Sequence, residues 1–362
     1  MNAINRAWLQ QFRRRLIAWY QRSARPLPWR ETRDPYRIWV SEIMLQQTTV
    51  VAVAPYFSRF LGRFPTLADL AGGSEEEVLR LWEGLGYYSR ARNLHKAAQV
   101  VMTQHGGQFP NTAAALESLP GIGRYTAGAI ASFAFDRPAP IVEANTLRLY
   151  CRLLAFDGDP RSAAGQKLLW EFAARVLPRK SPGRFNQALI ELGATICKPE
   201  SPACPTCPVK TACAAFTQGI QHLVPRPAVR PEMTDVTETA VVVMRGQQRL
   251  LIRRAPGERW GGLWDFPRFS INSHGNPAAD TRAIAEIVFD RLGVQIGTGK
   301  LLAVLRHTVT RYRITLRCYV ANQVGGELAD SLGVARWVTP AELDDLPLST
   351  TGRKIARLLS AR

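Results

Sequence analysis

Four of the six cysteines lie within one short segment, where they could hold a metal centre. Cys197, Cys204, Cys207 and Cys213 follow the pattern C-x6-C-x2-C-x5-C. Four thiolates at this spacing can converge on a zinc ion or on an iron–sulfur cluster without long loops. Zinc modules usually carry two C-x2-C pairs and this chain has one, so the spacing favours an iron–sulfur cluster in a reducing compartment.

Two carboxylates have the setting of catalytic acids. Glu42 interrupts the otherwise apolar helical stretch Trp39-Val-Ser-Glu-Ile-Met-Leu-Gln-Gln-Thr48, and Glu143 lies in Pro140-Ile-Val-Glu-Ala-Asn-Thr146. Burial among apolar groups raises the pKa of a carboxyl group, which can then act as a general acid near neutral pH. The alternatives are a charge near a helix start for Glu42, or a buried ion pair with an arginine for either residue.

A glycine-rich turn could bind phosphate. The segment Leu119-Pro-Gly-Ile-Gly-Arg-Tyr-Thr-Ala-Gly128 places Gly121 and Gly123 between an apolar residue and the expected start of a helix. Backbone N–H groups in such a turn, with the helix N-terminus behind them, can hold a phosphate. The segment lacks the Lys-Ser/Thr pair of a nucleotide-binding P-loop and follows no strand. It therefore favours a helix–hairpin–helix on a DNA backbone, although a plain turn between two helices has a similar sequence.

A mainly helical scaffold is expected to position these residues. Apolar residues recur at three- and four-residue spacing in 41–61, 75–102, 112–135, 144–155, 164–177 and 184–197. We therefore expect residues 1–222 to form one helical region. Residues 223–235 contain three prolines and no apolar periodicity, which predicts a stiff linker.

The remaining residues, 236–362, have the pattern of an α+β domain. Strand patterns occupy 239–244, 250–254, 301–306 and 312–320, and a helix is expected over 280–292. The length of 362 residues favours two domains over one. A second domain of strands and a helix after a linker agrees with that expectation.

The charge of the chain indicates a polyanionic partner. The net charge of +18 comes from 47 Lys and Arg against 29 Asp and Glu, which favours nucleic acid or an anionic membrane. An apolar content of 46% excludes a disordered chain. No apolar run reaches the roughly 18–20 residues of a membrane-spanning helix, and Arg13, Arg14 and Arg15 interrupt the first apolar stretch. We therefore expect a cytoplasmic protein without a signal peptide or a membrane partner.

Over nearly its whole length, the sequence resembles the MutY-type adenine DNA glycosylases of the endonuclease III superfamily. The segments that carry the resemblance are Leu27-Pro-Trp-Arg30, Trp39 to Thr48, Gly84-Leu-Gly-Tyr-Tyr88, Arg90-Ala-Arg-Asn-Leu94, Leu119 to Gly123, the four cysteines and Gly261-Gly-Leu-Trp-Asp-Phe-Pro267. The resemblance implies a helix–hairpin–helix glycosylase with one [4Fe-4S] cluster in the loop 197–213, followed by a nudix-like domain that recognises the lesion.

The resemblance also implies an activity and a partner. The family excises adenine mispaired with 8-oxoguanine or guanine in double-stranded DNA, as part of base excision repair. We expect a monomer, since DNA fills the binding groove, and a bacterial protein associated with the nucleoid. Adenine must leave the base stack to be reached.

Individual residues acquire roles from the same resemblance. Glu42 protonates the adenine, and Glu143 stabilises the oxocarbenium-like sugar left behind, as in glycoside hydrolysis. Tyr125 lies near the sugar, and Asn145 orients the acids or water. The expected contacts with the duplex and with the flipped adenine are Gly121, Gly123, Gln47, Tyr87, Trp29, Arg30, Leu45 and Gln187. Lyase members of the superfamily place a lysine at the position of Tyr125 to form a Schiff base, so we expect a monofunctional enzyme.

Two segments depart from the family pattern. Glu143-Ala-Asn145 replaces the usual Asp-Gly-Asn, and the extra methylene moves the carboxylate by roughly 1.3–1.5 Å; we expect Glu143 to act as a functional substitute. Val309-Thr310-Arg311 replaces the usual Phe-Ser-His. Thr310 keeps a hydroxyl and Arg311 supplies a fixed cation with five donors, so both are expected to recognise 8-oxoguanine. The alternative is a strand pair with surface arginines.

Three other functions are weighed against this one. The helix 282–293 lacks the paired glutamates with which nudix hydrolases bind magnesium, which argues against a nucleotide hydrolase. A thymine or uracil mismatch glycosylase on the same scaffold is the rival enzyme, although such proteins tend to lack the C-terminal domain. A non-catalytic iron–sulfur DNA-binding protein is the rival from another class.

Overall fold

The chain folds into two compact units. The computed structural model describes residues 4–227, 232–255, 257–271, 277–329 and 334–360. One unit contains Met1–Gly73 and Ser89–Val229, and the other contains Ser74–Tyr88 and Arg230–Arg362. Residues 228–231 of the predicted linker lie outside the described residues.

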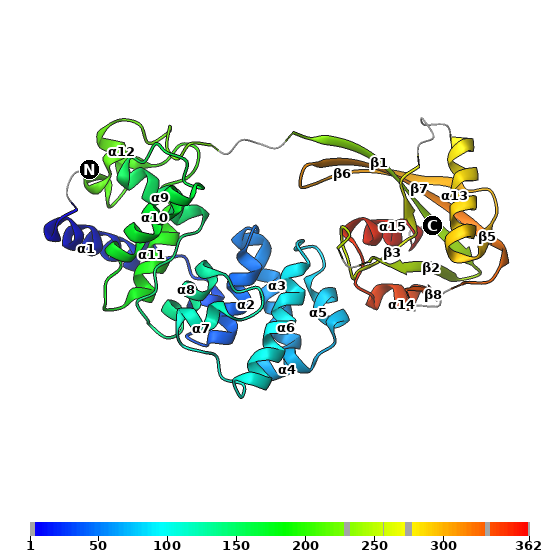
Figure 1. Ribbon diagram of the computed structural model, residues 1–362, viewed down its shortest axis with the longest axis horizontal. Coiled ribbons are helices and arrows are strands. Elements are labelled where there is room, and N and C mark those ends of the chain that lie inside the picture. The colour runs from blue at the N-terminus through cyan, green and yellow to red at the C-terminus, as the bar shows by residue number, and fades with distance from the viewer. Residues whose placement is uncertain (1–3, 228–231, 256, 272–276, 330–333, 361–362) are drawn as a thin grey trace. The chain divides into compact units, whose positions relative to one another are not determined.

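The first unit is helical, as predicted (Figure 1). Its helices are α1 (Arg6–Ser23), η1 (Pro28–Arg30), α2 (Pro35–Leu45), α3 (Val50–Arg63), α4 (Leu67–Gly72), α6 (Ser89–Gln104), α7 (Ala113–Glu117), α8 (Arg124–Phe133), α9 (Ala144–Leu154), α10 (Ala163–Val176), α11 (Pro182–Thr195), η2 (Cys204–Thr206), η3 (Lys210–Ala212) and α12 (Ala214–Thr217). Phe12 and Leu16 of α1 are fully buried against Tyr150 of α9 and Phe185 of α11. Burying each such side chain stabilises the unit by about 1.5–3 kcal/mol.

Besides 112–135, which contains the glycine-rich turn, two of the predicted helical stretches are interrupted where no turn was expected. The stretch 41–61 breaks between α2 and α3, where Gln47 has a φ of +58°. The stretch 75–102 breaks after Trp82, where Gly84 and Gly86 have φ values of +101° and +72°. A helix cannot continue through left-handed residues. Apolar residues continue across both breaks, which is why spacing alone predicted a single helix in each case.

The second unit is built on a mixed sheet. Its elements are α5 (Glu75–Trp82), β1 (Thr234–Arg245), β2 (Gln248–Arg253), β3 (Trp264–Asp265), β4 (Arg268–Phe269), α13 (Pro277–Leu292), β5 (Val294–Ile296), β6 (Lys300–Val309), β7 (Tyr312–Gly326), β8 (Ala335–Val338), α14 (Pro340–Asp345) and α15 (Thr350–Ser360). The central strand β1 runs parallel to β7 and antiparallel to β2, and β6 pairs antiparallel with β7. The predicted strands and the helix over 280–292 are therefore confirmed.

The two faces of this sheet bury alternate residues of β1. Ala240 and Val242 lie in a core that includes residues of α14 and α15, while Val241 and Val243 lie in one that includes residues of α13. Figure 1 shows α13 on one side of the sheet and α14 and α15 on the other. This alternation follows from the two-residue period of a strand. No helix in the described ranges is long and apolar enough to cross a membrane.

Candidate functional site

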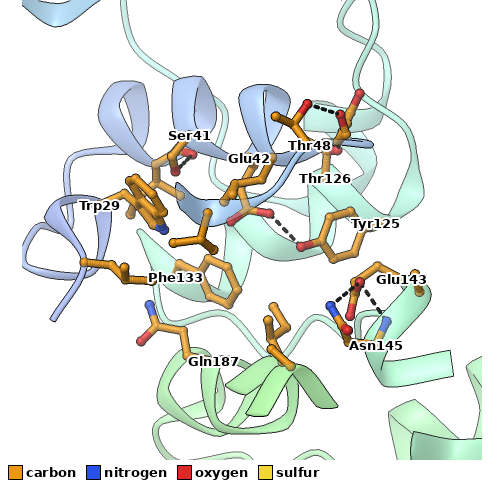
Figure 2. Close-up of a pocket in the computed structure, with 18 of the residues that line it drawn as sticks. Trp29, Ser41, Glu42, Thr48, Tyr125, Thr126, Phe133, Glu143, Asn145 and Gln187 are labelled. Atoms are coloured by element: carbon orange, nitrogen blue, oxygen red, sulfur yellow. Dashed lines mark hydrogen bonds between the residues drawn. The ribbon is translucent and has the colours of Figure 1, made fainter. Parts of the chain in front are cut away.

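A cleft of about 960 Å³ in the first unit collects most of the predicted catalytic and adenine-binding residues. It is lined by residues of η1, α2, α8, α9 and α11 and of the segments between them (Figure 2). The predicted residues that line it are Trp29, Arg30, Glu42, Leu45, Gln47, Gly123, Tyr125, Glu143, Asn145 and Gln187.

Glu42 lies in the C-terminal half of α2 with its carboxyl group directed into this cleft (Figure 2). Its side chain is buried, at 5% exposure, and Tyr125 Oη donates a hydrogen bond of 2.6 Å to Glu42 Oε2. Burial raises the pKa of Glu42 to about 7, while the Tyr125 hydrogen bond opposes the shift and the charge of Glu143 adds to it. Glu42 can therefore hold a proton near neutral pH. Its position near the C-terminal end of α2 disagrees with the alternative of a charge at a helix start.

Glu143 is the N-cap of α9, and both of its carboxylate oxygens are occupied. Oε2 accepts from the backbone N–H of Asn145 at 2.9 Å and from its side-chain Nδ2 at 3.2 Å, and Oε1 accepts from Thr146 N at 2.8 Å. Burial raises the pKa of Glu143, and the hydrogen bonds from Asn145 and Thr146 oppose that shift. Figure 2 shows the contacts between Asn145 and Glu143 below the Glu42–Tyr125 pair.

Asn145 is held in turn from the side of the cysteine segment. Arg148 Nη2 donates to Asn145 Oδ1 at 2.9 Å and to Gly193 O at 2.8 Å, and Arg148 Nε donates to Cys197 O at 2.8 Å. Gly193 is required here because an added Cβ would lie 2.7 Å from Asn145 Cβ. Where α9 and α11 approach each other, the side chains of Asn145 and Arg148 thus connect the Glu143 carboxylate to the backbone carbonyl of Cys197.

The predicted pocket residues Trp29, Arg30 and Gln187 lie along one side of the cleft. Trp29 is 5% exposed and packs edge-on against Phe57 at 5.4 Å. Tyr20 Oη donates to Gln187 Oε1 at 3.1 Å. The side chains therefore form a fixed wall that combines a large ring with polar groups.

Two residues that hold this wall, Glu191 and Arg25, were not predicted from the sequence. Glu191 is fully buried and accepts hydrogen bonds from Arg25 Nε and from Arg30 Nη2, both at 2.7 Å. Burial works to raise the pKa of Glu191, but the hydrogen bonds from the two arginines prevail and lower it. Glu191 stands in the apolar helical stretch 184–197, which is the same signal that identified Glu42.

The glycine-rich turn links α7 to α8, as a hairpin between two helices. Gly121 has a φ of +74°, and a Cβ there would lie 2.5 Å from Asn93 Cβ, so only glycine fits.

The two glycines of this turn line different cavities. Gly123 is the N-cap residue of α8 and lines the main cleft, whereas Gly121 lines a separate small cavity with Trp39 and Arg90. Arg90 Nη1 donates to the carbonyl groups of Ile43 and Met44, which fixes the end of α2.

Three predicted DNA-contacting residues belong to the second unit and are absent from the lining of the cleft. Tyr87 is 56% exposed and has a φ of +47°. Thr310 and Arg311 form the turn between β6 and β7, where Thr310 has a φ of +52°. A β-branched residue in the left-handed region is an outlier, and such strain clusters at functional sites.

The four predicted metal ligands line one pocket beside α9. Apolar walls surround their sulfur atoms, and Arg152 Nη1 donates to Cys197 Sγ at 3.2 Å. In the thiol form, burial raises the pKa of Cys207 to about 12. Within the described part of the chain, no group of His, Cys, Asp and Glu side chains is arranged to hold a metal ion as it stands. Four cysteines facing one apolar pocket are nevertheless a donor set that suits an iron–sulfur cluster.

Comparison with known families agrees with this geometry. Residues 40–175 match the HhH-GPD superfamily base excision DNA repair proteins, and residues 239–358 match the NUDIX domain. The solved structure of a thermostable thymine-DNA glycosylase covers 59% of this chain with 29% identity and a TM-score of 0.55. A trapped endonuclease III–DNA intermediate, 22% identical over 60% of the chain with a TM-score of 0.51, shares the fold.

Relatives that match most of this chain are adenine DNA glycosylases. The protein of Rattus norvegicus is 34% identical over 402 residues, covering 96% of this chain and 77% of the rat protein. The Homo sapiens protein is 33% identical and covers 96% of this chain and 73% of its own length. The protein of Buchnera aphidicola subsp. Acyrthosiphon pisum is 34% identical over 71% of this chain and 74% of its own length. The chain therefore belongs to the adenine DNA glycosylases, the DNA N-glycosylases of base excision repair that combine an HhH-GPD region with a NUDIX-like domain.

Proposed function

We propose that this adenine DNA glycosylase hydrolyses the N-glycosidic bond of adenine paired with 8-oxoguanine or guanine in double-stranded DNA, without cleaving the strand. The observation that carries the proposal is the pair of carboxyl groups in one cleft, one buried and bonded to a tyrosine, the other capping a helix. This arrangement gives the two acids different environments and hence different tasks.

Glu42 is the proton donor in this mechanism. Its carboxyl group transfers a proton to a ring nitrogen of the flipped adenine, so that the C1′–N9 electron pair leaves with a neutral base. Tyr125 holds the orientation of Glu42 through the 2.6 Å hydrogen bond. Trp29, Arg30, Leu45 and Gln187 bind the base, and the Glu191 carboxylate keeps Arg30 in place.

Glu143 acts on the sugar. Its carboxylate stabilises the positive charge that develops on C1′ and O4′ as the base departs. Water then adds to C1′ and releases a proton to solvent, which balances the proton that Glu42 gave to the base and later regains from solvent. Asn145 holds Glu143 through its backbone and side-chain N–H groups. Tyr125 stands where a lyase would carry its amine, so the product is an intact abasic site.

Thr310 and Arg311 recognise the opposite base. Thr310 Oγ1 donates its proton to Val309 O at 2.7 Å, which leaves the lone pairs of the hydroxyl to accept a hydrogen bond. 8-Oxoguanine offers an N7–H donor where guanine has an N7 acceptor, so an acceptor distinguishes the two bases. Arg311 supplies donors to a carbonyl oxygen or to the phosphate.

Three further proposals concern the organisation of the protein. Cys197, Cys204, Cys207 and Cys213 would hold one [4Fe-4S] cluster, which when bound ties the loop 197–213 together as a folding element. The glycosylase region spans 1–222, the linker 223–235 and the lesion-recognition domain 236–362. The protein acts as a monomer on chromosomal DNA in the bacterial cytoplasm, with Gly121, Gly123, Gln47 and Tyr87 contacting the duplex.

The test is excision on a matched set of labelled duplexes. Adenine, thymine or uracil is placed opposite guanine or 8-oxoguanine, and each product is analysed with and without alkali. We expect cleavage only for adenine and only after alkali. Release of thymine or uracil, or strand cleavage without alkali that survives repurification, would contradict the proposal. Glu171→Gln, an exposed change on α10, serves as a control variant.

A further inference from the structure

The second unit contains a stack of alternating arginine and aromatic side chains that ends at the β6–β7 turn. The guanidinium carbon of Arg268 lies 4.8 Å from the ring centre of Trp260, and that of Arg259 lies 5.6 Å from the same ring. Arg259 also lies 5.2 Å from the ring of Tyr312, and Arg311 lies 5.3 Å from it. These five residues are called the arginine–aromatic stack below.

The inner end of the stack is anchored in the core. Glu238, 4% exposed, pairs with Arg259 and lies 3.4 Å from Arg268 Nη1. Arg268 Nη2 donates to Thr351 Oγ1 at 2.6 Å and lies 3.6 Å from Asp265 Oδ2. The charges of both inner arginines are therefore matched by buried carboxylates, and their side chains are fixed.

The outer end presents Arg311 to solvent in a defined position. Arg311 Nη2 donates to Tyr312 Oη at 3.2 Å, and the Arg311 carbonyl oxygen accepts from Thr234 N at 2.8 Å. The preceding residue, Thr310, has a φ of +52°, so the turn has a conformation that its sequence does not favour. Contacts on both sides of Arg311 thus determine where its guanidinium lies.

We propose that the arginine–aromatic stack positions Arg311 for recognition of the base opposite adenine, with Tyr312 and Arg259 as specificity-determining positioning residues. This inference rests on the proposed role of the Thr310–Arg311 turn. A free arginine side chain loses much rotamer entropy when it is fixed on binding. Stacking on Tyr312 restricts the Arg311 side chain before DNA binds, so less rotamer entropy is lost on binding. It also leaves the N–H edge of the planar guanidinium available to a base or phosphate.

The experiment compares single-turnover excision of adenine opposite 8-oxoguanine with excision opposite guanine. The ratio of the two rates is measured for wild type, Arg311→Ala, Tyr312→Ala, Tyr312→Phe and the double variant with alanine at 311 and 312. Arg313→Ala is the matched control. Arg313 lies next to Tyr312 on β7, and it pairs with Asp235, which is not part of the stack. The rate opposite guanine reports any general loss of folding.

Arg311→Ala and Tyr312→Ala are each expected to lower the ratio by about two- to fivefold, the range of an exposed cation–π contact. The double variant should lose no more than either single variant, and Tyr312→Phe, which keeps the ring, should lose less. If Arg311→Ala lowers the ratio while Tyr312→Ala and Tyr312→Phe do not, the stack has no positioning role. If Arg311→Ala leaves the ratio unchanged, recognition by this turn fails, and the stack proposal fails with it.

Discussion

Replacing the buried acid Glu42 by glutamine is expected to stabilise the protein at neutral pH and to slow excision strongly. The pKa of Glu42 is about 7 in the folded chain against 4.5 for an unperturbed carboxyl group. Each pKa unit corresponds to about 1.4 kcal/mol. Because Glu42 ionises more readily in the unfolded chain, the free energy of unfolding is lower by about 3 kcal/mol above pH 7 than it would be with an unperturbed pKa. Glutamine carries no such penalty.

The raised pKa of Glu42 makes the stability of the wild-type protein depend on pH. Because the folded pKa is raised, the folded state binds a proton that the unfolded state has lost between about pH 4.5 and pH 7, and stability falls across that window. Glutamine can still accept the Tyr125 hydrogen bond, while its new amide group costs about 1 kcal/mol if unpaired. We therefore expect Glu42→Gln to be about 2 kcal/mol more stable than wild type at pH 8, and no more stable at pH 4.5.

The measurements are denaturant unfolding at several pH values and single-turnover excision. Loss of a general acid should slow excision by about 10²–10⁴-fold, and the wild-type rate should fall about tenfold per pH unit above pH 7. Glu171→Gln, with an exposed side chain, should change stability by less than about 0.5 kcal/mol. An excision rate within tenfold of wild type for Glu42→Gln, or a stability difference that is the same at pH 4.5 and pH 8, would refute the reasoning.

Four other outcomes follow from the site. Glu143→Gln should slow single-turnover excision by at least about 10²-fold, since it removes the charge that faces the sugar; a near-parental rate would contradict that role. Tyr125→Phe removes a hydrogen bond that lowers the pKa of Glu42, so the alkaline limb of the pH–rate profile should move to higher pH and not stay in place. Cys207→Ser should lower the iron and acid-labile sulfide content from about four each per chain, whereas bound zinc in wild type would exclude the cluster. Affinity for undamaged DNA should fall steeply with salt, with a slope of roughly −0.9 per phosphate contact in a log–log plot; a flat plot would mean that the charge of +18 is not used in binding.

The chemistry-bearing residues could be predicted from the sequence because each has a local signal. Glu42 is an acid within apolar helical spacing, and the glycine-rich turn has a fixed pattern before a helix. Glu191 has the same signal as Glu42 and was missed, because its function depends on Arg25 and Arg30, more than 160 residues away in sequence.

Long-range contacts account for most of what could not be predicted. Nothing in the sequence of α5 indicates that Ser74–Tyr88 belongs with the second unit, where Arg353 pairs with Glu83 at 2.8 Å. The arginine–aromatic stack likewise joins residues from three separate segments, 259–260, 268 and 311–312. The helix breaks after α2 and α5 were hidden because apolar residues continue through them, and the positive φ of Gln47 and Tyr87 has no signature in residue type.

The assignment of acid and charge stabiliser follows from the donors around each carboxyl group. Glu42 accepts one hydrogen bond from a neutral hydroxyl group in a buried position, which leaves burial to dominate and favours its protonated form. Burial raises the pKa of Glu143 as well, but three hydrogen bonds from N–H groups at the N-terminus of α9 and the positive charge of Arg148 oppose that rise, so more groups favour its ionised form than favour that of Glu42. Capping also explains how this position accommodates glutamate, since the longer side chain reaches two successive backbone N–H groups with separate oxygens. The same contacts that complete the helix therefore hold a negative charge where the sugar cation would form.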